Sequence, residues 1–101
     1  MDEEAQIRLT YPRWTRERGT PVHWEDGAAV WTRVDDGVPL VEGNAAGLRA
    51  LARILLTLAA EDVPVGTHVH LATWSMLEPG STEIILERAP EPDPGPDAPA
   101  S

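Results

Sequence analysis

Two histidines separated by one residue, His68 and His70, are the constellation in this chain that has the spacing of metal ligands. Alternate residues of a β-strand project to the same side, so both imidazoles could reach one ion, and Glu83 or Glu87 could supply a third ligand. The same histidines beside a cross-strand glutamate also suit simple polar pairing on an exposed strand. The histidine pair therefore leaves a metal site and a polar surface both open.

Catalysis by His68 with Glu87 would need a nucleophile or a metal-bound water, together with an oxyanion site. Ser75 and Ser81 lie close by in the sequence, but neither has a Gly-x-Ser-x-Gly setting. The sequence also has no phosphate-binding loop and no dinucleotide fingerprint. We therefore expect no catalytic residue and no cofactor. The alternative is a small metal-binding domain or metal-dependent enzyme centred on His68-x-His70.

Tryptophan supplies nearly all the aromatic surface, because the chain has four Trp, one Tyr and no Phe. Trp14, Trp24 and Trp74 fall in or beside predicted loops, where each could close a shallow core. Trp and Arg are also over-represented at interface hot spots. Trp31, with Arg33 on the same side of a predicted strand, is where we expect such an interface.

Alternating apolar and polar residues predict the strands of the first half of the chain. They cover Gln6–Tyr11, a short piece at Pro21–Trp24, then Ala28–Val34 and Val38–Glu42. Two Asp-Gly pairs form the turns that connect the last three of these segments, because glycine accepts the positive φ that hairpin turns need. The proline in the last strand favours an edge position.

A helix follows from Ala45 to Ala60, with Asn44 as its N-cap and Pro64 beyond its end. The predicted core stripe consists of Leu48, Leu51, Ala52, Leu55, Leu58 and Ala59. Ile54 and Leu56 widen this stripe and leave open a homodimer formed through either of them. The predicted polar far face consists of Arg49, Arg53 and Thr57.

The last two predicted strands, Thr67–Ala72 and Thr82–Arg88, form a hairpin. One register keeps their apolar residues on one face, since a shift by one residue would reverse the faces. This register pairs Leu71 with Ile84, Val69 with Leu86, His68 with Glu87, and His70 with Ile85, with Glu83 diagonal to His70.

The predicted fold class is α+β: a mostly antiparallel sheet with one amphipathic helix packed on one face, in the order strands, helix, hairpin. The face of the sheet away from the helix stays uncovered unless a partner covers it. That face carries Arg8, Trp31, Arg33, His68, His70, Glu83, Ile85 and Glu87. From these we select Trp31, Arg33, His68, His70, Glu83 and Glu87 as the partner-binding residues.

The chain of 101 residues fits a single domain, for which we expect residues 1–88. Residues 89–101 are acidic and rich in proline, so we expect a disordered tail. The net charge of −9 argues against nucleic acid as a partner, and no apolar run is long enough to cross a membrane. With no cysteine and no signal peptide, the expected location is the cytoplasm.

Three segments resemble the immunity protein 32 family in their order and spacing. Glu42–Ala52 is similar to that family's Gly-Asn-x-x-Gly-Leu-x-x-Leu-Ala helix start, and Pro64–Leu71 to its Gly-x-His-x-His-Leu strand. Leu77–Glu87 resembles its Leu-x-x-Gly-Ser-x-Glu-Leu-x-Ile-Glu return. The resemblance covers about half of the chain, from Glu42 to Arg88.

The resemblance implies a bacterial immunity protein of a polymorphic toxin system. Such a protein would bind a cognate protein toxin and block it by direct occlusion, with no catalytic residue of its own. The family fixes no toxin class. A nuclease would suit an acidic inhibitor, because carboxylates can occupy a site built for phosphate.

Overall fold

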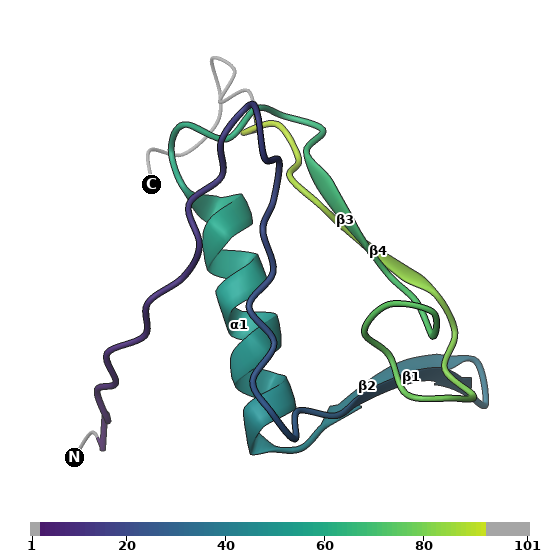
Figure 1. The fold of residues 1–101 in the computed structure, drawn as a ribbon. Coiled ribbons are helices and arrows are strands. Elements are labelled where there is room, and N and C mark those ends of the chain that lie inside the picture. Colours follow the sequence, from purple (N-terminus) through teal and green to yellow (C-terminus); the bar gives the residue numbers. More distant parts are fainter. Residues whose placement is uncertain (1–2, 93–101) are drawn as a thin grey trace, which may run out of the picture.

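The computed structural model describes residues 3–92, which fold into an α+β domain of one helix and four strands. Figure 1 shows the elements around helix α1. In chain order they are β1 (Val30–Asp35), β2 (Val38–Gly43), α1 (Ala45–Ala59), β3 (His68–Leu71) and β4 (Ile84–Glu87). The predicted class and the order strands, helix, hairpin are confirmed.

The first hairpin joins β1 to β2 through Asp36 and Gly37, whose φ angles are 52° and 79°. Positive φ at both central residues defines a type I′ turn, whose twist matches that of the paired strands. The antiparallel register places Asp35 opposite Val38, which leaves a two-residue loop. The predicted turn at this Asp-Gly pair is confirmed.

The second hairpin pairs β3 with β4 in the predicted register. His68 lies opposite Glu87, Val69 opposite Leu86, His70 opposite Ile85, and Leu71 opposite Ile84. Val69 and Leu71 are buried, because their side of the hairpin faces the core. The histidines therefore point to the outside.

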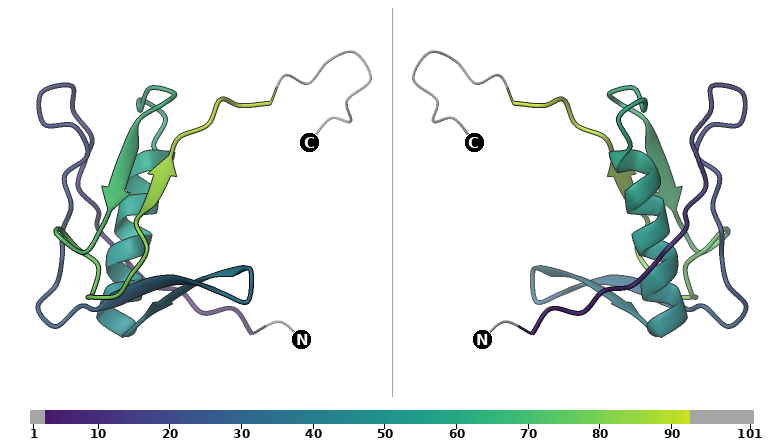
Figure 2. Two further views of the ribbon diagram at one scale, coloured as in Figure 1. Left: turned by 90° about the vertical axis from the view of Figure 1, so that its right-hand side faces the viewer. Right: turned by 90° about the vertical axis from the view of Figure 1, so that its left-hand side faces the viewer.

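The four strands form two separate two-stranded sheets, where the sequence predicted one sheet. Loop residues take the place of a continuous ladder along β1: Glu78 N donates to Val30 O at 2.9 Å, and Thr82 N donates to Thr32 O at 2.8 Å. Ser81 Oγ accepts from Thr32 N at 3.1 Å. The loop before β4 thus joins the hairpins, whose strands run in different directions (Figure 2).

Helix α1 begins at the predicted cap. Asn44 Oδ1 accepts from Gly47 N at 2.8 Å and from Ala29 N at 3.0 Å, while Asn44 Nδ2 donates to Gly27 O at 2.8 Å. One side chain therefore satisfies the first helical turn and fixes it to the chain that enters β1. The close approach also explains Gly47, since a Cβ there would lie 2.2 Å from Ala29 O.

The end of α1 is held by Arg88, which follows β4. Its Nη1 donates to Leu58 O at 2.7 Å and to Ala60 O at 2.8 Å. The last carbonyls of a helix lack partners within the helix and carry partial negative charge, so a guanidinium stabilises this end. The C-terminal hairpin is thereby tied to the helix end.

The core lies between α1 and the two hairpins. Its buried apolar cluster consists of Val30, Ile54, Leu58, Val69, Leu71 and Leu77. Val22, Trp24, Leu51, Met76, Ile84 and Leu86 pack against this cluster. Every described element except β2 contributes a residue to this cluster or to its surround.

The buried side of α1 differs from the predicted stripe. It consists of Gly47, Ala50, Ile54, Thr57 and Leu58. Leu48 and Leu55 were predicted to be buried, but both are 51% exposed. Thr57 was predicted to face solvent and is fully buried. Ile54 is 1% exposed and cannot form a dimer contact, whereas Leu56 is 39% exposed.

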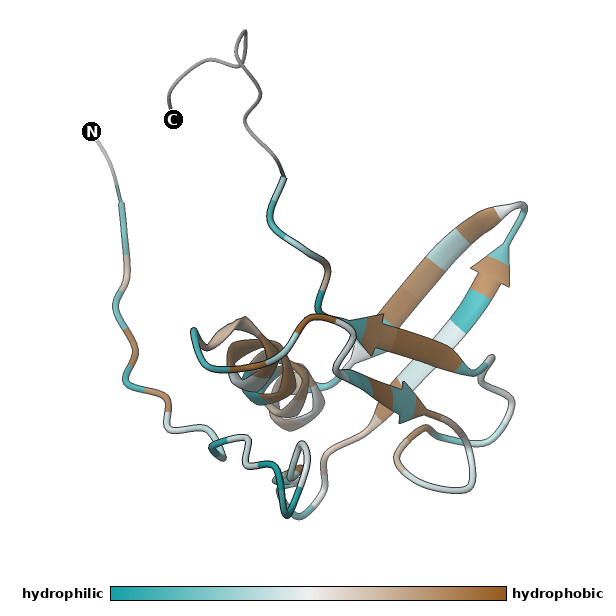
Figure 3. Cartoon of the chain, turned by 90° about the horizontal axis from the view of Figure 1, so that it is seen from above, coloured by the Kyte–Doolittle hydropathy of each residue, from teal (hydrophilic) through white to brown (hydrophobic). Residues whose placement is uncertain are grey.

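The N-terminal segment explains this rotation of the helix. Arg53 Nε donates to Thr10 O at 3.1 Å, and Thr57 Oγ1 donates to Pro12 O at 2.6 Å. These bonds draw the polar side of the helix against its own chain (Figure 3, where the N-terminal segment and the hairpins lie on different sides of the helix). The apolar side is consequently turned outward.

The strands predicted at Gln6–Tyr11 and Pro21–Trp24 are wrong. Neither segment is a strand, although Thr15 and Gly19 form an isolated bridge between them. Ile7 is 76% exposed, so alternation along this segment does not reflect burial. Arg8 accordingly lies on this segment and not on a sheet. Of the predicted tail, residues 93–101 lie outside the described residues.

Candidate functional site

The outer face of the β3–β4 hairpin collects polar side chains because of strand alternation. His68, His70, Ile85 and Glu87 are exposed, while Val69 and Leu71, which alternate with the histidines, are buried. Glu83 comes directly before β4 and is also exposed. The register thus groups two imidazoles and two carboxylates on one small surface.

Each histidine contacts an oxygen through its Nδ1 atom. His68 Nδ1 lies 2.9 Å from Gly66 O, and His70 Nδ1 lies 3.1 Å from Glu83 Oε2. Because a carbonyl oxygen can only accept, His68 Nδ1 is the donor in its bond. The two rings meet edge to face, with their centroids 5.2 Å apart. The predicted diagonal contact between His70 and Glu83 is therefore present.

Metal chemistry has little support at this face. Within residues 3–92, no group of three or more His, Cys, Asp or Glu side chains could hold a metal ion. Glu87 lies opposite His68 in the register, yet the two do not belong to such a group. The histidine pair thus lacks the third ligand that the metal-centred alternative requires.

The two serines considered as nucleophiles are engaged with backbone groups. Ser75 Oγ donates to Ala72 O at 3.2 Å, and Ser81 Oγ accepts from Thr32 N at 3.1 Å. Each hydroxyl stabilises a turn or joins two segments of the chain. The described structure pairs neither serine with a histidine, so it provides no base for a nucleophile.

Trp31 and Arg33 lie on the outer face of the other hairpin. Trp31 is 36% exposed, and Arg33 Nη1 lies 3.2 Å from Glu42 Oε1 across the strand pair. The six predicted contact residues are all exposed, but they fall on two separate hairpins. They form two patches, and not the one continuous sheet face that the sequence predicted.

Trp74 is the functional candidate that the sequence analysis placed only in a loop. Its residue is 78% exposed, the largest value among the exposed large apolar residues of the described chain. The turn is held by Ser75, Met76 and Leu77, whose backbone N–H groups all bond Ala72 O at about 3 Å. This loop joins β3 to β4 at the end where His70 meets Glu83. A tryptophan between two apolar pairs, Leu71-Ala72 and Met76-Leu77, was the signal available in the sequence.

The charge around the β3–β4 face is negative. After Arg53 the chain has no Lys and one Arg, Arg88, whose guanidinium is directed to the carbonyls at the end of α1. Glu83 and Glu87 therefore have no Lys or Arg side chain from this half of the chain beside them. Such a surface is complementary to a basic partner.

A second polar cluster joins Glu25 to the helix. Arg49 Nε and Nη2 each bond Glu25 at 3.1 Å, and Arg53 Nη1 lies 2.7 Å from Glu25 Oε2. Hydrogen bonds from Arg49 and then from Arg53 lower the pKa of Glu25 from 4.5 to about 2. The hydrogen bond to Glu25 likewise raises the pKa of Arg49. This cluster fastens the residues before β1 to α1.

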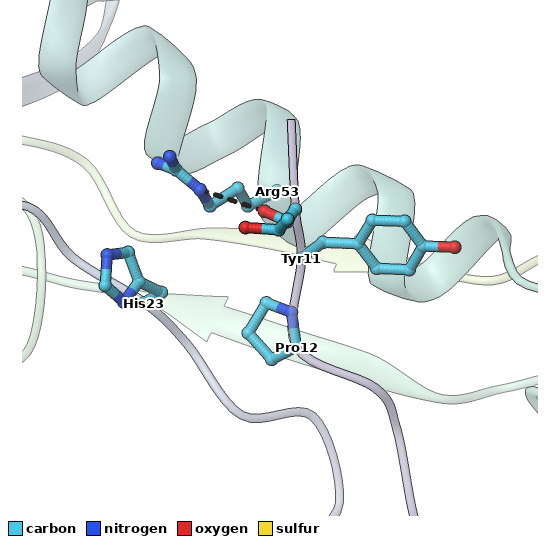
Figure 4. Close-up of a pocket in the computed structure, with 5 residues that line it drawn as sticks. Tyr11, Pro12, His23 and Arg53 are labelled. Atoms are coloured by element: carbon cyan, nitrogen blue, oxygen red, sulfur yellow. Dashed lines mark hydrogen bonds between the residues drawn. The ribbon is translucent and has the colours of Figure 1, made fainter. Parts of the chain in front are cut away.

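Beside this cluster lies a small open pocket with a volume of about 280 Å³ (Figure 4). Thr10, Tyr11, Pro12, His23 and Arg53 line it. Arg53 already donates to Thr10 O and to Glu25, so its guanidinium holds the N-terminal segment against the helix. The pocket lies where these two parts of the chain meet.

Fold and surface together define a small α+β domain whose exposed side chains suit binding, and in which the described residues present no assembled catalytic group. The family model described as immunity protein 32 matches residues 39–89. The chain belongs to the immunity protein 32 family, which confirms the resemblance seen in the sequence. No curated protein and no solved structure matches.

The family match contains most of the candidate surface. Residues 39–89 include nearly all of β2 and the whole of α1, β3 and β4. They therefore include His68, His70, Glu83 and Glu87, together with Trp74, whereas Trp31 and Arg33 precede the match. In the described part of the chain, no helix has the length and apolar character that crossing a membrane requires.

Proposed function

We propose that this chain neutralises a cognate protein toxin by binding it directly and covering its working surface, without catalysis. Membership of the immunity protein 32 family supports an immunity role in general. The exposed, acidic outer face of the β3–β4 hairpin lies inside the matched residues and carries the proposal. His68, His70, Glu83, Glu87 and Trp74 are its contact residues.

The chemistry of this face suits a basic partner surface. Glu83 and Glu87 supply negative charge, which steers association and favours Arg- or Lys-rich sites. Trp74 supplies exposed aromatic area of the kind that anchors hot spots. Trp31 and Arg33 form a second, outlying patch of the same interface. If the toxin is a nuclease, the carboxylates would occupy positions that otherwise hold phosphate.

A protection assay tests this proposal through charge reversal. The chain is co-expressed with a toxin encoded beside it, and survival is scored together with co-purification. We expect the wild type to protect and to co-purify in fixed stoichiometry. The double variant E83R/E87R should bind at least about 100-fold more weakly, since it places like charges opposite a basic surface.

The matched control is E4R/E17R, which makes the same charge change on two exposed residues outside the family match. This variant should protect as well as the wild type. Equal loss in E4R/E17R and E83R/E87R would mean that total charge, and not this face, determines binding. Full protection by E83R/E87R would overturn the proposed interface.

Trp74→Ala tests the aromatic part of the face separately. Truncating a hot-spot tryptophan typically weakens a complex at least about tenfold. Because Trp74 is 78% exposed, its removal should leave the far-UV circular dichroism spectrum and the unfolding midpoint unchanged. Unaltered affinity of W74A for the toxin would remove Trp74 from the interface.

A further inference from the structure

The solvent-facing side of α1 is apolar along its length. Leu48 and Leu55 are each 51% exposed, Ala59 is exposed, and Ala52 between them is half-buried. The basic residues of the helix lie on its other side, where Arg49 and Arg53 bond Glu25. Seen from the side away from the hairpins, the N-terminal segment crosses the helix (Figure 2). A surface helix normally shows the reverse arrangement.

The four residues of this face follow a heptad pattern. Leu48, Ala52, Leu55 and Ala59 are separated by four, three and four positions. This spacing keeps them in one seam along the helix, as in the core positions of a coiled coil. Leucine and alanine alternate along the seam, so each large side chain is followed by a small one. We define these four residues as the helix seam.

We propose that the helix seam binds a second copy of this chain, with the two α1 helices antiparallel about a two-fold axis between Ala52 and Leu55. That axis places Leu48 opposite Ala59 of the other copy and Ala52 opposite its Leu55. Every layer of the contact then combines one large and one small side chain. A surface that is complementary to itself in this way is what a two-fold symmetric interface requires.

Charge places a second copy at the helix seam rather than at the outer face of β3–β4. Each chain has a net charge of −9, so two copies repel, and this repulsion is smallest where the surfaces that meet carry no charge. The helix seam has none, whereas the outer face of β3–β4 carries Glu83 and Glu87. The dimer would use no side chain of the outer β3–β4 face, because the helix seam contains no residue of that hairpin.

The oligomeric state of the purified full chain tests this inference. Light scattering after size exclusion should give twice the chain mass, falling toward the single-chain mass on dilution. Leu55→Glu should be a monomer at every concentration, because it buries two carboxylates at the axis. Circular dichroism and thermal unfolding verify that L55E, altered at a half-exposed residue, is still folded.

An exchange of the two central residues tests the pairing itself. Ala52→Leu alone would place two large side chains opposite each other in the central layer, since position 52 faces Leu55 of the other copy. It should weaken the dimer at least about tenfold. The double variant A52L/L55A restores one large and one small residue in that layer, so it should recover most of the wild-type dimer. A monomeric wild type would overturn the inference. So would a dimer that survives L55E, or A52L/L55A no stronger than A52L.

The dimer does not depend on the proposed toxin interface. Loss of toxin binding in E83R/E87R with an unchanged dimer would support both proposals. If L55E abolished toxin binding and the free wild-type chain were monomeric, the helix seam would instead be a toxin contact. That result would overturn the dimer.

Discussion

The two sides of helix α1 differ in what covers them. Arg49, Arg53 and Thr57 lie against the chain's own N-terminal segment and against Glu25. Leu48 and Leu55, on another side, are half-exposed. A polar side covered by the same chain and an apolar side left open are the reverse of the usual surface helix.

The difference shows how hydrogen bonds can decide which side of a helix is buried. Among the described residues no strand pairs with the N-terminal segment, and its Thr10 and Pro12 carbonyls accept from Arg53 and Thr57. The bond to Pro12 is partly buried, and a buried carbonyl without a donor is costly, so Thr57 stabilises the segment on the helix. The bond from Arg53 to Thr10 is exposed and adds a second contact. The apolar residues that remain outside are then available for a partner.

The largest expected effect is on stability, and it contrasts two neighbouring residues of α1: Ile54 on the buried side and Leu55 on the open side. Ile54→Ala should lower the free energy of unfolding by about 3–4 kcal/mol, because it leaves a cavity in the core. Leu55→Ala should lower it by less than about 1 kcal/mol in dilute solution. Urea unfolding of both variants measures the contrast. Equal losses would mean that the two sides are equally packed.

Gly47→Ala tests the close approach at the start of the buried side. Its Cβ would lie 2.2 Å from Ala29 O, a backbone atom that cannot move without disturbing the cap at Asn44. We expect a loss of about 2–3 kcal/mol after the gain in helix propensity is included. Gly43→Ala is the matched control, since its Cβ would lie 3.2 Å from the movable Leu48 side chain and 3.3 Å from Ala29 O, so it meets the same backbone atom without a severe overlap. A stable G47A would contradict the described packing.

Thr57→Val tests the hydrogen bond that holds the N-terminal segment. Valine keeps the shape of the buried side chain but leaves Pro12 O without its donor, which should cost about 1–2 kcal/mol. Amide hydrogen exchange should rise in residues 10–20 of T57V and stay constant in β3 and β4. An equal rise in exchange in residues 10–20 and in both hairpins would contradict a local role for the bond from Thr57 to Pro12.

The smallest effect concerns acid stability. Because the pKa of Glu25 is lowered from 4.5 to about 2 in the fold, its contribution is present above pH 4.5 and disappears as the pH falls toward 2. Glu25→Gln should therefore be less stable than the wild type at neutral pH, with a difference that shrinks between pH 4.5 and 2. Denaturant unfolding across this range measures it, with Glu17→Gln as control. A difference independent of pH would contradict the ion cluster.

Local patterns predicted the elements with strong turn or cap signals. The register of β3 with β4, the turn at Asp36-Gly37 and the Asn44 cap are as the sequence indicated, because each depends on neighbouring residues. The helix seam was assigned to the core because apolar residues cover more than half of the helix circumference. Periodicity alone cannot tell which part of so wide an arc is buried.

Long-range contacts account for the remaining differences. Alternation at Gln6–Tyr11 is typical of a strand, but no strand pairs with it among the described residues, and the helix takes its carbonyls instead. The loop with Glu78, Ser81 and Thr82 bonds along β1, so the two hairpins are connected through this loop and not through a shared ladder of strands. This separation divides the predicted contact residues into two patches. Exposure of Trp74 depends on how this loop turns, which its local sequence does not determine.

The most direct test of the proposed function is the footprint of a bound toxin on this chain, mapped by NMR on the isotope-labelled protein. We expect changes at His68–His70, at the Trp74 indole and at Glu83–Glu87, with the helix seam unaffected. A footprint centred on Leu48 and Leu55, with the outer face of β3–β4 unchanged, would contradict it.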